Sequence, residues 1–288
     1  MNNLEYFELY PNIDVYKNVL INPQDFYNII KRSESENLDT SFFRKWDKWA
    51  HFGTYTQKKW TDEYSSVDLN NNKFIEEKQF VDQVEEAYSL VLKDYTFRHN
   101  IELKDGWHFS GCSFCKYDSD VNTLKNEMTM QYHTDFIISQ KDMPGDKFKI
   151  TCTMYINDDY EGGDLEFFID GNIITYKPNA GDIVVFPSDA PYYHGVKVIK
   201  NGHKYFVRNF IMEPFEGTNE WLENQKRYGA YKWGQMESKR IDFEDDRNMI
   251  YLIDGRPVKY EDLPLKYNEV SILDGGTKSF ANENKEQM

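Results

Sequence analysis

The chain has 288 residues, of which 40% are hydrophobic and 29% charged, a composition typical of a globular protein rather than a disordered one. Its formal net charge of −15 disfavours binding to nucleic acid or to an anionic membrane, so neither is expected as a partner. The N-terminus shows no signal peptide, and no apolar run approaches the length of a membrane span. With only 3 cysteines a disulfide framework is not expected, which favours a cytoplasmic protein.

The N-terminal part, residues 1–100, is predicted to be a mostly helical region that supports the core. Asn22 and Pro23 are typical of a helix start, with Asn as N-cap and Pro at the first helical position. From about Phe74 to Tyr95, apolar residues recur at spacings of three and four. This period predicts an amphipathic helix that covers a core.

From residue 107 the pattern changes to short runs rich in β-branched and aromatic residues, separated by turn signals. Eight such strands indicate a closed or double-sheet β fold, and nothing in them reads as a βαβ unit. We therefore expect an α+β protein with a mainly β core. The predicted strands are Trp107–Tyr117, Glu127–Ile138, Phe148–Asn157, Asp164–Ile169, Asn172–Tyr176, Asp182–Phe186, Tyr193–Ile199 and Tyr205–Met212.

After Pro214 the pattern loosens. We predict a helix within residues 217–240, a small hairpin around Asp254 and Gly255, and a disordered tail from Asp274 onward. The organisation we expect is one structural domain in three parts: the support region at 1–100, the β core at 101–214 and a C-terminal extension at 215–288.

Cys112 and Cys115 have CxxC spacing, which can serve zinc or redox chemistry. A structural zinc site usually needs two such pairs, and the chain has no second pair. A thioredoxin-like motif belongs to a βαβ setting, which is not predicted here. In a strand, this odd spacing sends the two thiols to opposite faces, so we interpret both as buried structural cysteines.

The strongest chemical signal is the His-x-Asp pair formed by His133 and Asp135. Side chains two positions apart in a strand share a face, so one short strand could present both to a metal. Their candidate partner is His194. Two imidazoles and one carboxylate are the ligand set of a mononuclear non-haem iron(II) site with open positions. Spacing alone leaves open whether these residues bind a metal or are ordinary polar residues.

Further features follow these residues in a fixed order. They are Thr151–Asn157, Glu161–Phe167, Lys177–Pro187, His194 with the following Gly-Val, and Gly202–Tyr205 ahead of a final strand. With this series, residues 105–213 resemble the Fe(II)- and 2-oxoglutarate-dependent oxygenases of the prolyl 4-hydroxylase-like family. The resemblance implies a double-stranded β-helix, a jelly-roll of the cupin-like kind, with N-terminal flanking helices and a C-terminal extension.

The resemblance also implies roles for individual residues. His133, Asp135 and His194 would hold the iron. Lys204 stands where the family places a Lys or Arg that pairs with the distal carboxylate of 2-oxoglutarate. Tyr155 matches a position whose hydroxyl can bond the same carboxylate.

The chain departs from the family pattern at two points. Many members carry a Tyr about ten residues before the first iron-binding His, where this chain has Thr123; Tyr117 is a candidate counterpart. Arg208 is a rival of Lys204 for the carboxylate, because their even spacing puts both side chains on the same face of the predicted strand.

The implied activity is hydroxylation of a C–H bond, coupled to decarboxylation of 2-oxoglutarate to succinate. The cofactors would be Fe(II), 2-oxoglutarate as cosubstrate and O2, with ascorbate as a candidate reductant. The substrate is open between a prolyl residue in a peptide or protein and a free amino acid or other small metabolite, since fold and cofactor do not fix it. An inactive jelly-roll binding module is the alternative from another class, which the presence of all three candidate ligands and of the distal cation disfavours.

Overall fold

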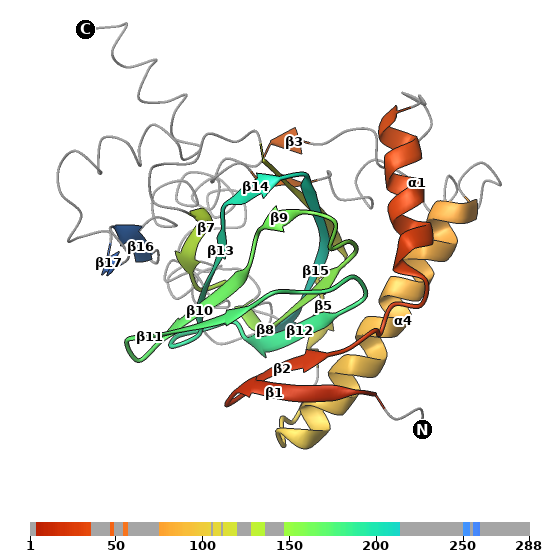
Figure 1. The fold of residues 1–288 in the computed structure, drawn as a ribbon. Helices are drawn as coiled ribbons and strands as arrows, with labels where there is room; N and C mark the ends of the chain where they lie inside the picture. The colour runs from red at the N-terminus through yellow and green to blue at the C-terminus, as the bar shows by residue number, and fades with distance from the viewer. Residues whose placement is uncertain are drawn as a thin grey trace, which may run out of the picture.

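The computed structural model describes residues 4–35, 47–48, 54–56, 75–104, 106–110, 112–119, 128–135, 147–213, 250–253 and 256–259. Two antiparallel sheets dominate this part of the chain and curve around each other into a barrel, which Figure 1 shows nearly end-on. The helices of the described residues, α1 (Pro23–Ser35) and α4 (Ile75–Arg98), lie on the same side of the barrel.

The larger sheet has the strand order β1-β2-β12-β8-β15-β6-β4-β3, with β5 added beside β15. All its pairings are antiparallel. Its strands are β1 (Tyr6–Tyr10), β2 (Ile13–Tyr16), β3 (Asp47–Lys48), β4 (Thr54–Thr56), β5 (His108–Phe109), β6 (Ser113–Asp118), β8 (Lys147–Tyr155), β12 (Ile183–Pro187) and β15 (His203–Glu213).

The smaller sheet has the order β11-β10-β13-β7-β16-β17, also antiparallel. Its strands are β7 (Met128–His133), β10 (Leu165–Ile169), β11 (Asn172–Tyr176), β13 (Tyr193–Lys197), β16 (Ile250–Ile253) and β17 (Arg256–Lys259). A separate two-stranded piece joins β9 (Glu161–Gly162) to β14 (Ile199–Asn201).

The chain crosses repeatedly between the two sheets. β6, β8, β12 and β15 lie in the larger sheet, while β7, β10, β11 and β13 lie in the smaller one. Eight strands that alternate between two antiparallel sheets in this way form a double-stranded β-helix, so the predicted fold is confirmed. The predicted strands all correspond to strands in the structure, with shifted ends.

The two faces of the larger sheet pack against two different hydrophobic clusters. On β12, Val184 and Phe186 point between the sheets, whereas Ile183 and Val185 point outward into a second hydrophobic cluster. Because both faces are covered, β12 reads as a continuous apolar run rather than an alternating one.

The outer cluster is covered by α1 (Pro23–Ser35) and α4 (Ile75–Arg98). Both helices were predicted, and α1 does begin at Pro23. Residues of α4 at helical spacing, such as Phe80 and Val84, are fully buried against the sheet. The rings of Phe26 and Phe80 stack at 4.2 Å between centroids, which joins the two helices to each other.

The N-terminal region also contains strands that the sequence did not reveal. All four residues of β2 are buried, and β2 pairs with β12. Its pattern was hidden because Asp14 places a charge in the middle of the strand. That carboxylate is paired with Arg98 at 2.8 Å and His99 at 2.7 Å, which makes its burial tolerable.

Several smaller predictions can also be compared with the structure. The hairpin around Asp254 and Gly255 is confirmed by the antiparallel pair β16–β17. The helix at 217–240 and the disordered tail lie outside the described residues.

Cys112 packs in the outer cluster and Cys115 in the inner one, so the two thiols do lie on opposite faces. No helix in the described ranges is long and apolar enough to cross a membrane.

Candidate active site

The three predicted metal ligands come together at one end of the barrel. His133 is the last residue of β7 and is paired in register with His194 on β13. Their imidazole rings lie 4.4 Å apart between centroids. One ligand atom from each of His133, Asp135 and His194 lies within 4.8 Å of the other two.

Asp135 reaches this cluster in a different way from that expected. β7 ends at His133, so Asp135 lies beyond the strand rather than on the same strand face. Its Oδ1 is nevertheless 3.7 Å from Nε2 of His133, and its Oδ2 is 3.4 Å from Nε2 of His194. The two histidines are thus placed by strand pairing, whereas the carboxylate depends on side-chain contacts for its position.

His194 is prepared to act as a neutral ligand. Its Nδ1 lies 3.3 Å from the carbonyl oxygen of Tyr192, which favours the tautomer with its proton on Nδ1 and leaves the Nε2 lone pair facing Asp135. The ring of Phe186 packs edge-on against it at 4.6 Å. Burial lowers the pKa of His194 to about 4, against the opposing effect of Asp135, so the imidazole is uncharged at neutral pH.

Asp135 is held in its ionised form. Burial acts to raise its pKa, but the imidazoles of His194 and His133 and a hydrogen bond from Thr151 together hold the pKa of this carboxyl well below its usual range. Two neutral imidazoles and one carboxylate suit Fe(II). A structural zinc site would need a fourth protein ligand, and calcium or magnesium would need more oxygen atoms. The donor set fits iron(II).

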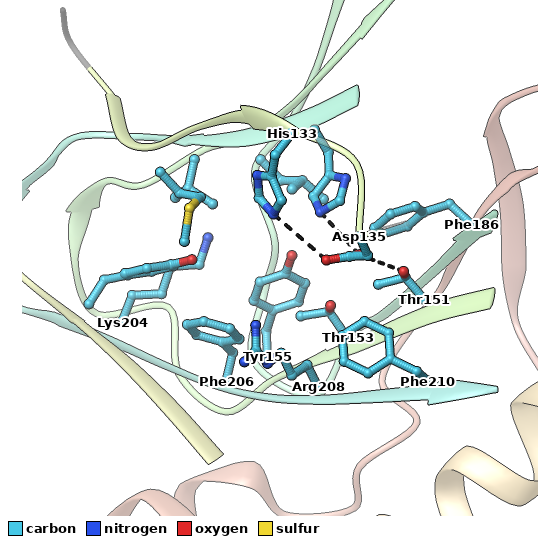
Figure 2. A pocket seen from close by; sticks show the side chains of 15 residues that line it. His133, Asp135, Thr151, Thr153, Tyr155, Phe186, Lys204, Phe206, Arg208 and Phe210 are labelled. Atoms are coloured by element: carbon cyan, nitrogen blue, oxygen red, sulfur yellow. Dashed lines mark hydrogen bonds and ion pairs between the residues drawn. The ribbon is translucent and has the colours of Figure 1, made fainter. Parts of the chain in front are cut away.

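A pocket opens from this cluster toward the interior of the barrel, and the side chains that line it come from both sheets (Figure 2). Lys204 of β15 lies at some distance from the His-Asp cluster, and Tyr155 of β8 stands between them in this view. Arg208 and Tyr117 line the same pocket. All five predicted site residues therefore line one pocket, together with Arg208, the rival of Lys204, and Tyr117, the candidate counterpart of the family tyrosine.

Lys204 is a buried cation, with a residue exposure of only 1%. Its Nζ donates a hydrogen bond to the carbonyl oxygen of Gly163 at 2.5 Å and lies 4.8 Å from the ring centroid of Tyr155 and 5.5 Å from that of Tyr160. Among the described residues, no carboxylate lies within ion-pair distance of it. A buried ammonium that lacks a protein counter-ion is suited to receive an anion.

Three residues near the site were missed by the sequence reasoning. Thr151 and Ser188 form a hydroxyl pair beside Asp135, and Tyr160 packs over Lys204. Strand alternation contained a signal for Thr151, because Thr151, Thr153 and Tyr155 are two positions apart and line the same pocket. Ser188 and Tyr160 lie outside strands and carried no comparable signal.

Comparison with known proteins gives one match at the sequence level and several in structure. Residues 119–212 match the family model described as the 2OG-Fe(II) oxygenase superfamily. No curated protein matches the sequence.

The similar solved structures include three prolyl hydroxylases. A Pseudomonas putida prolyl-4-hydroxylase is 15% identical, covering 70% of this chain and 92% of its own, with a TM-score of 0.46. A prolyl hydroxylase from Trichoplax adhaerens, in complex with a hypoxia inducible factor oxygen degradation domain peptide fragment, is 13% identical, covering 70% and 84%, with a TM-score of 0.48. A viral collagen prolyl hydroxylase from Paramecium Bursaria Chlorella virus-1 is 14% identical, covering 70% and 90%, with a TM-score of 0.44.

Proposed function

We propose that the protein hydroxylates a C–H bond at the site formed by His133, Asp135 and His194, as an oxygenase of the 2OG-Fe(II) superfamily whose model residues 119–212 match. The observation that carries the proposal is the geometry of these three side chains, whose ligand atoms lie within 4.8 Å of one another and which line the same pocket as a buried cation. When bound there, Fe(II) with 2-oxoglutarate supplies the oxidising power for O2 chemistry that no side chain has.

The protonation states and the number of the protein ligands suit a metal that must also bind other molecules. Because His194 is neutral and Asp135 ionised, each offers a lone pair without first losing a proton. With these three side chains as its protein ligands, a bound Fe(II) would keep open positions for 2-oxoglutarate and dioxygen.

Lys204 is assigned to the far carboxylate of 2-oxoglutarate. It lies in the same pocket as the metal ligands, and its ammonium is oriented by Gly163 and by the ring of Tyr155. Tyr155 is fully buried beside it, and burial raises the pKa of its hydroxyl well above the usual value, so the group stays a hydrogen-bond donor. An ammonium and a phenol together can bind both oxygens of one carboxylate.

We propose two alternative classes of substrate, a prolyl residue in a peptide or protein and a small free acid. A prolyl residue in a peptide or protein follows from the sequence resemblance. A free amino acid or similar small acid is favoured by Arg208, a second cation in the pocket that could bind a substrate carboxylate. The three buried thiols support the cytoplasmic, reducing location expected from the sequence.

The proposal is tested by adding Fe(II) and 2-oxoglutarate to the full chain without oxygen, followed by exposure to air. We expect a visible charge-transfer absorption before air is admitted and succinate afterwards. A panel of prolyl peptides and free amino acids, scored by substrate-dependent succinate, separates the two substrate classes. The enzyme proposal is rejected if neither the absorption nor succinate is observed.

Variants separate the roles of the site residues. His133→Ala and Asp135→Ala should abolish iron-dependent turnover, because each removes a metal ligand. Lys204→Ala should mainly raise the 2-oxoglutarate concentration needed for half-maximal rate. If Arg208→Ala raises that concentration and Lys204→Ala does not, the assignment of the carboxylate to Lys204 is wrong.

A further inference from the structure

Asp135 is held by a hydroxyl from the opposite sheet. Thr151, on β8 of the larger sheet, donates a hydrogen bond from Oγ1 to Oδ2 of Asp135 at 2.6 Å, drawn as a dashed line in Figure 2. The same Oγ1 lies 2.9 Å from the hydroxyl oxygen of Ser188, which follows β12. Thr151 is 2% exposed and Ser188 is fully buried, so water does not compete for these hydrogen bonds.

The direction of this chain of hydrogen bonds follows from the available protons. An ionised carboxylate can only accept, and a threonine hydroxyl has a single proton to donate. Because Thr151 gives its proton to Asp135, the proton between the two hydroxyls must come from Ser188. The order is therefore Ser188 to Thr151 to Asp135, each donor strengthening the next. The backbone of Ser188 is fixed in turn, since its amide donates to the carbonyl of Lys149 at 3.1 Å.

Asp135 needs this support more than the histidines do. Strand pairing places His133 and His194, but Asp135 lies beyond the end of β7 and has no such constraint. Its carboxylate also has two oxygens that could both bind a metal. A hydrogen bond to Oδ2 engages that oxygen and leaves Oδ1 as the better ligand.

We propose that Thr151 and Ser188 are positioning residues that hold Asp135 as a ligand through one oxygen. The inference rests on the proposed function, since it assumes that the His133, Asp135 and His194 cluster binds Fe(II). Binding through one oxygen matters there because a second carboxylate oxygen would occupy a position that 2-oxoglutarate or dioxygen requires.

The test compares the affinity of the metal-free full chain for Fe(II), measured without oxygen by competition with a chelator. Thr151→Val keeps the shape of the side chain and removes the donor, so it should weaken Fe(II) binding about 10- to 100-fold, as is usual for partners of metal ligands. Thr151→Ser keeps the hydroxyl and should retain most of the wild-type affinity. Ser188→Ala should give a smaller loss, because Thr151 can still donate.

The outcomes are distinguishable from failure of the proposed function. If the wild-type chain does not bind Fe(II), the proposed function and this inference both fail. If the wild type binds, equal affinity of Thr151→Val and wild type overturns the inference, as does a Thr151→Ser variant as weak as Thr151→Val. Melting temperatures check folding, and if Thr151→Val does not fold, unchanged affinity in Ser188→Ala overturns the inference instead.

Discussion

The side chain of Lys204 is buried away from solvent. Burial lowers the pKa of its ammonium to about 7, a change that Asp164 opposes and Lys177 reinforces. The rings of Tyr155 and Tyr160 face it, and burial raises the pKa of both phenols above the usual value, so neither ionises near neutral pH. Near pH 7 the free protein therefore divides between charged and neutral forms of this one lysine.

This position predicts that 2-oxoglutarate binding takes up a proton. Only the ammonium pairs with the carboxylate, and the free protein loses that proton as the pH rises through about 7. The apparent dissociation constant should therefore increase above that pH, approaching about tenfold per pH unit until the pKa of the bound form is reached. Titrations with 2-oxoglutarate from about pH 6.5 to about pH 8.5 measure this directly.

The matched control is Lys204→Arg. A guanidinium stays charged throughout this range, so the variant should bind 2-oxoglutarate with an affinity that hardly changes with pH. A wild-type dissociation constant that is equally flat would show that Lys204 keeps its proton in the free protein.

At the scale of elements, the site depends on how closely β13 approaches β7. Gly195 follows His194 at this crossing and is not among the glycines with positive φ, so a glycine is needed here for space rather than for backbone conformation. A Cβ at this position would lie 2.8 Å from the carbonyl oxygen of Met130 and 3.1 Å from the amide nitrogen of Tyr132. Both are backbone atoms of β7 and cannot move without moving the strand.

Gly195→Ala should therefore push the two histidine-bearing strands apart. We expect a stability loss of about 1–3 kcal/mol, as for other overpacked sites, and weaker binding of Fe(II). Denaturant unfolding and anaerobic Fe(II) titration measure the two effects separately.

Gly171→Ala is the control for a loss of stability without damage to the site. Gly171 lies in the β10–β11 turn at φ +82°, with nothing within 4 Å of an added Cβ. The substitution should cost about 1–2 kcal/mol through backbone strain alone and leave Fe(II) affinity unchanged. If Gly195→Ala also left that affinity unchanged, strand spacing would not control the metal site.

The sequence predicted those elements that a local pattern of residue types indicates. Short strands and turns gave the β core, and the family spacing pointed to His133, Asp135 and His194 before any geometry was known. It could not show that Asp135 lies outside β7, because strand ends are set by pairing across the sheet. The strand β2 was missed for a related reason, since the partners of Asp14 are Arg98 at the end of α4 and the next residue, His99, which are far away in the sequence.

At the scale of the whole molecule, the larger sheet separates the chemistry from its support. Alternate residues of β8 face in opposite directions: Thr151 and Thr153 line the pocket, while Cys152 and Met154 pack in the outer cluster beneath α4. The helices thus stabilise the wall of the barrel without entering the site, and stability and metal binding should respond to different substitutions.

Tyr88 of α4 gives the sharpest test of this separation. Its hydroxyl is buried, donates to the carbonyl oxygen of Val207 at 2.6 Å and accepts from the amide of Met154 at 3.2 Å, which links the helix to β15 and β8. Tyr88→Phe leaves both backbone groups without this partner and should cost about 1–3 kcal/mol of stability. Fe(II) affinity should stay at the wild-type value, because the pocket lies on the other face of the sheet.

Urea unfolding gives the change in midpoint, and an unchanged m-value would show that the folded and unfolded states are otherwise alike. Tyr27→Phe is the matched control, because the hydroxyl of Tyr27 bonds to Asp159 at the surface and its loss should change stability by less than about 0.5 kcal/mol. A Tyr88→Phe variant with normal stability would mean that the helix is held by apolar packing alone. One with weakened Fe(II) binding would mean that the outer layer also sets the geometry of the site.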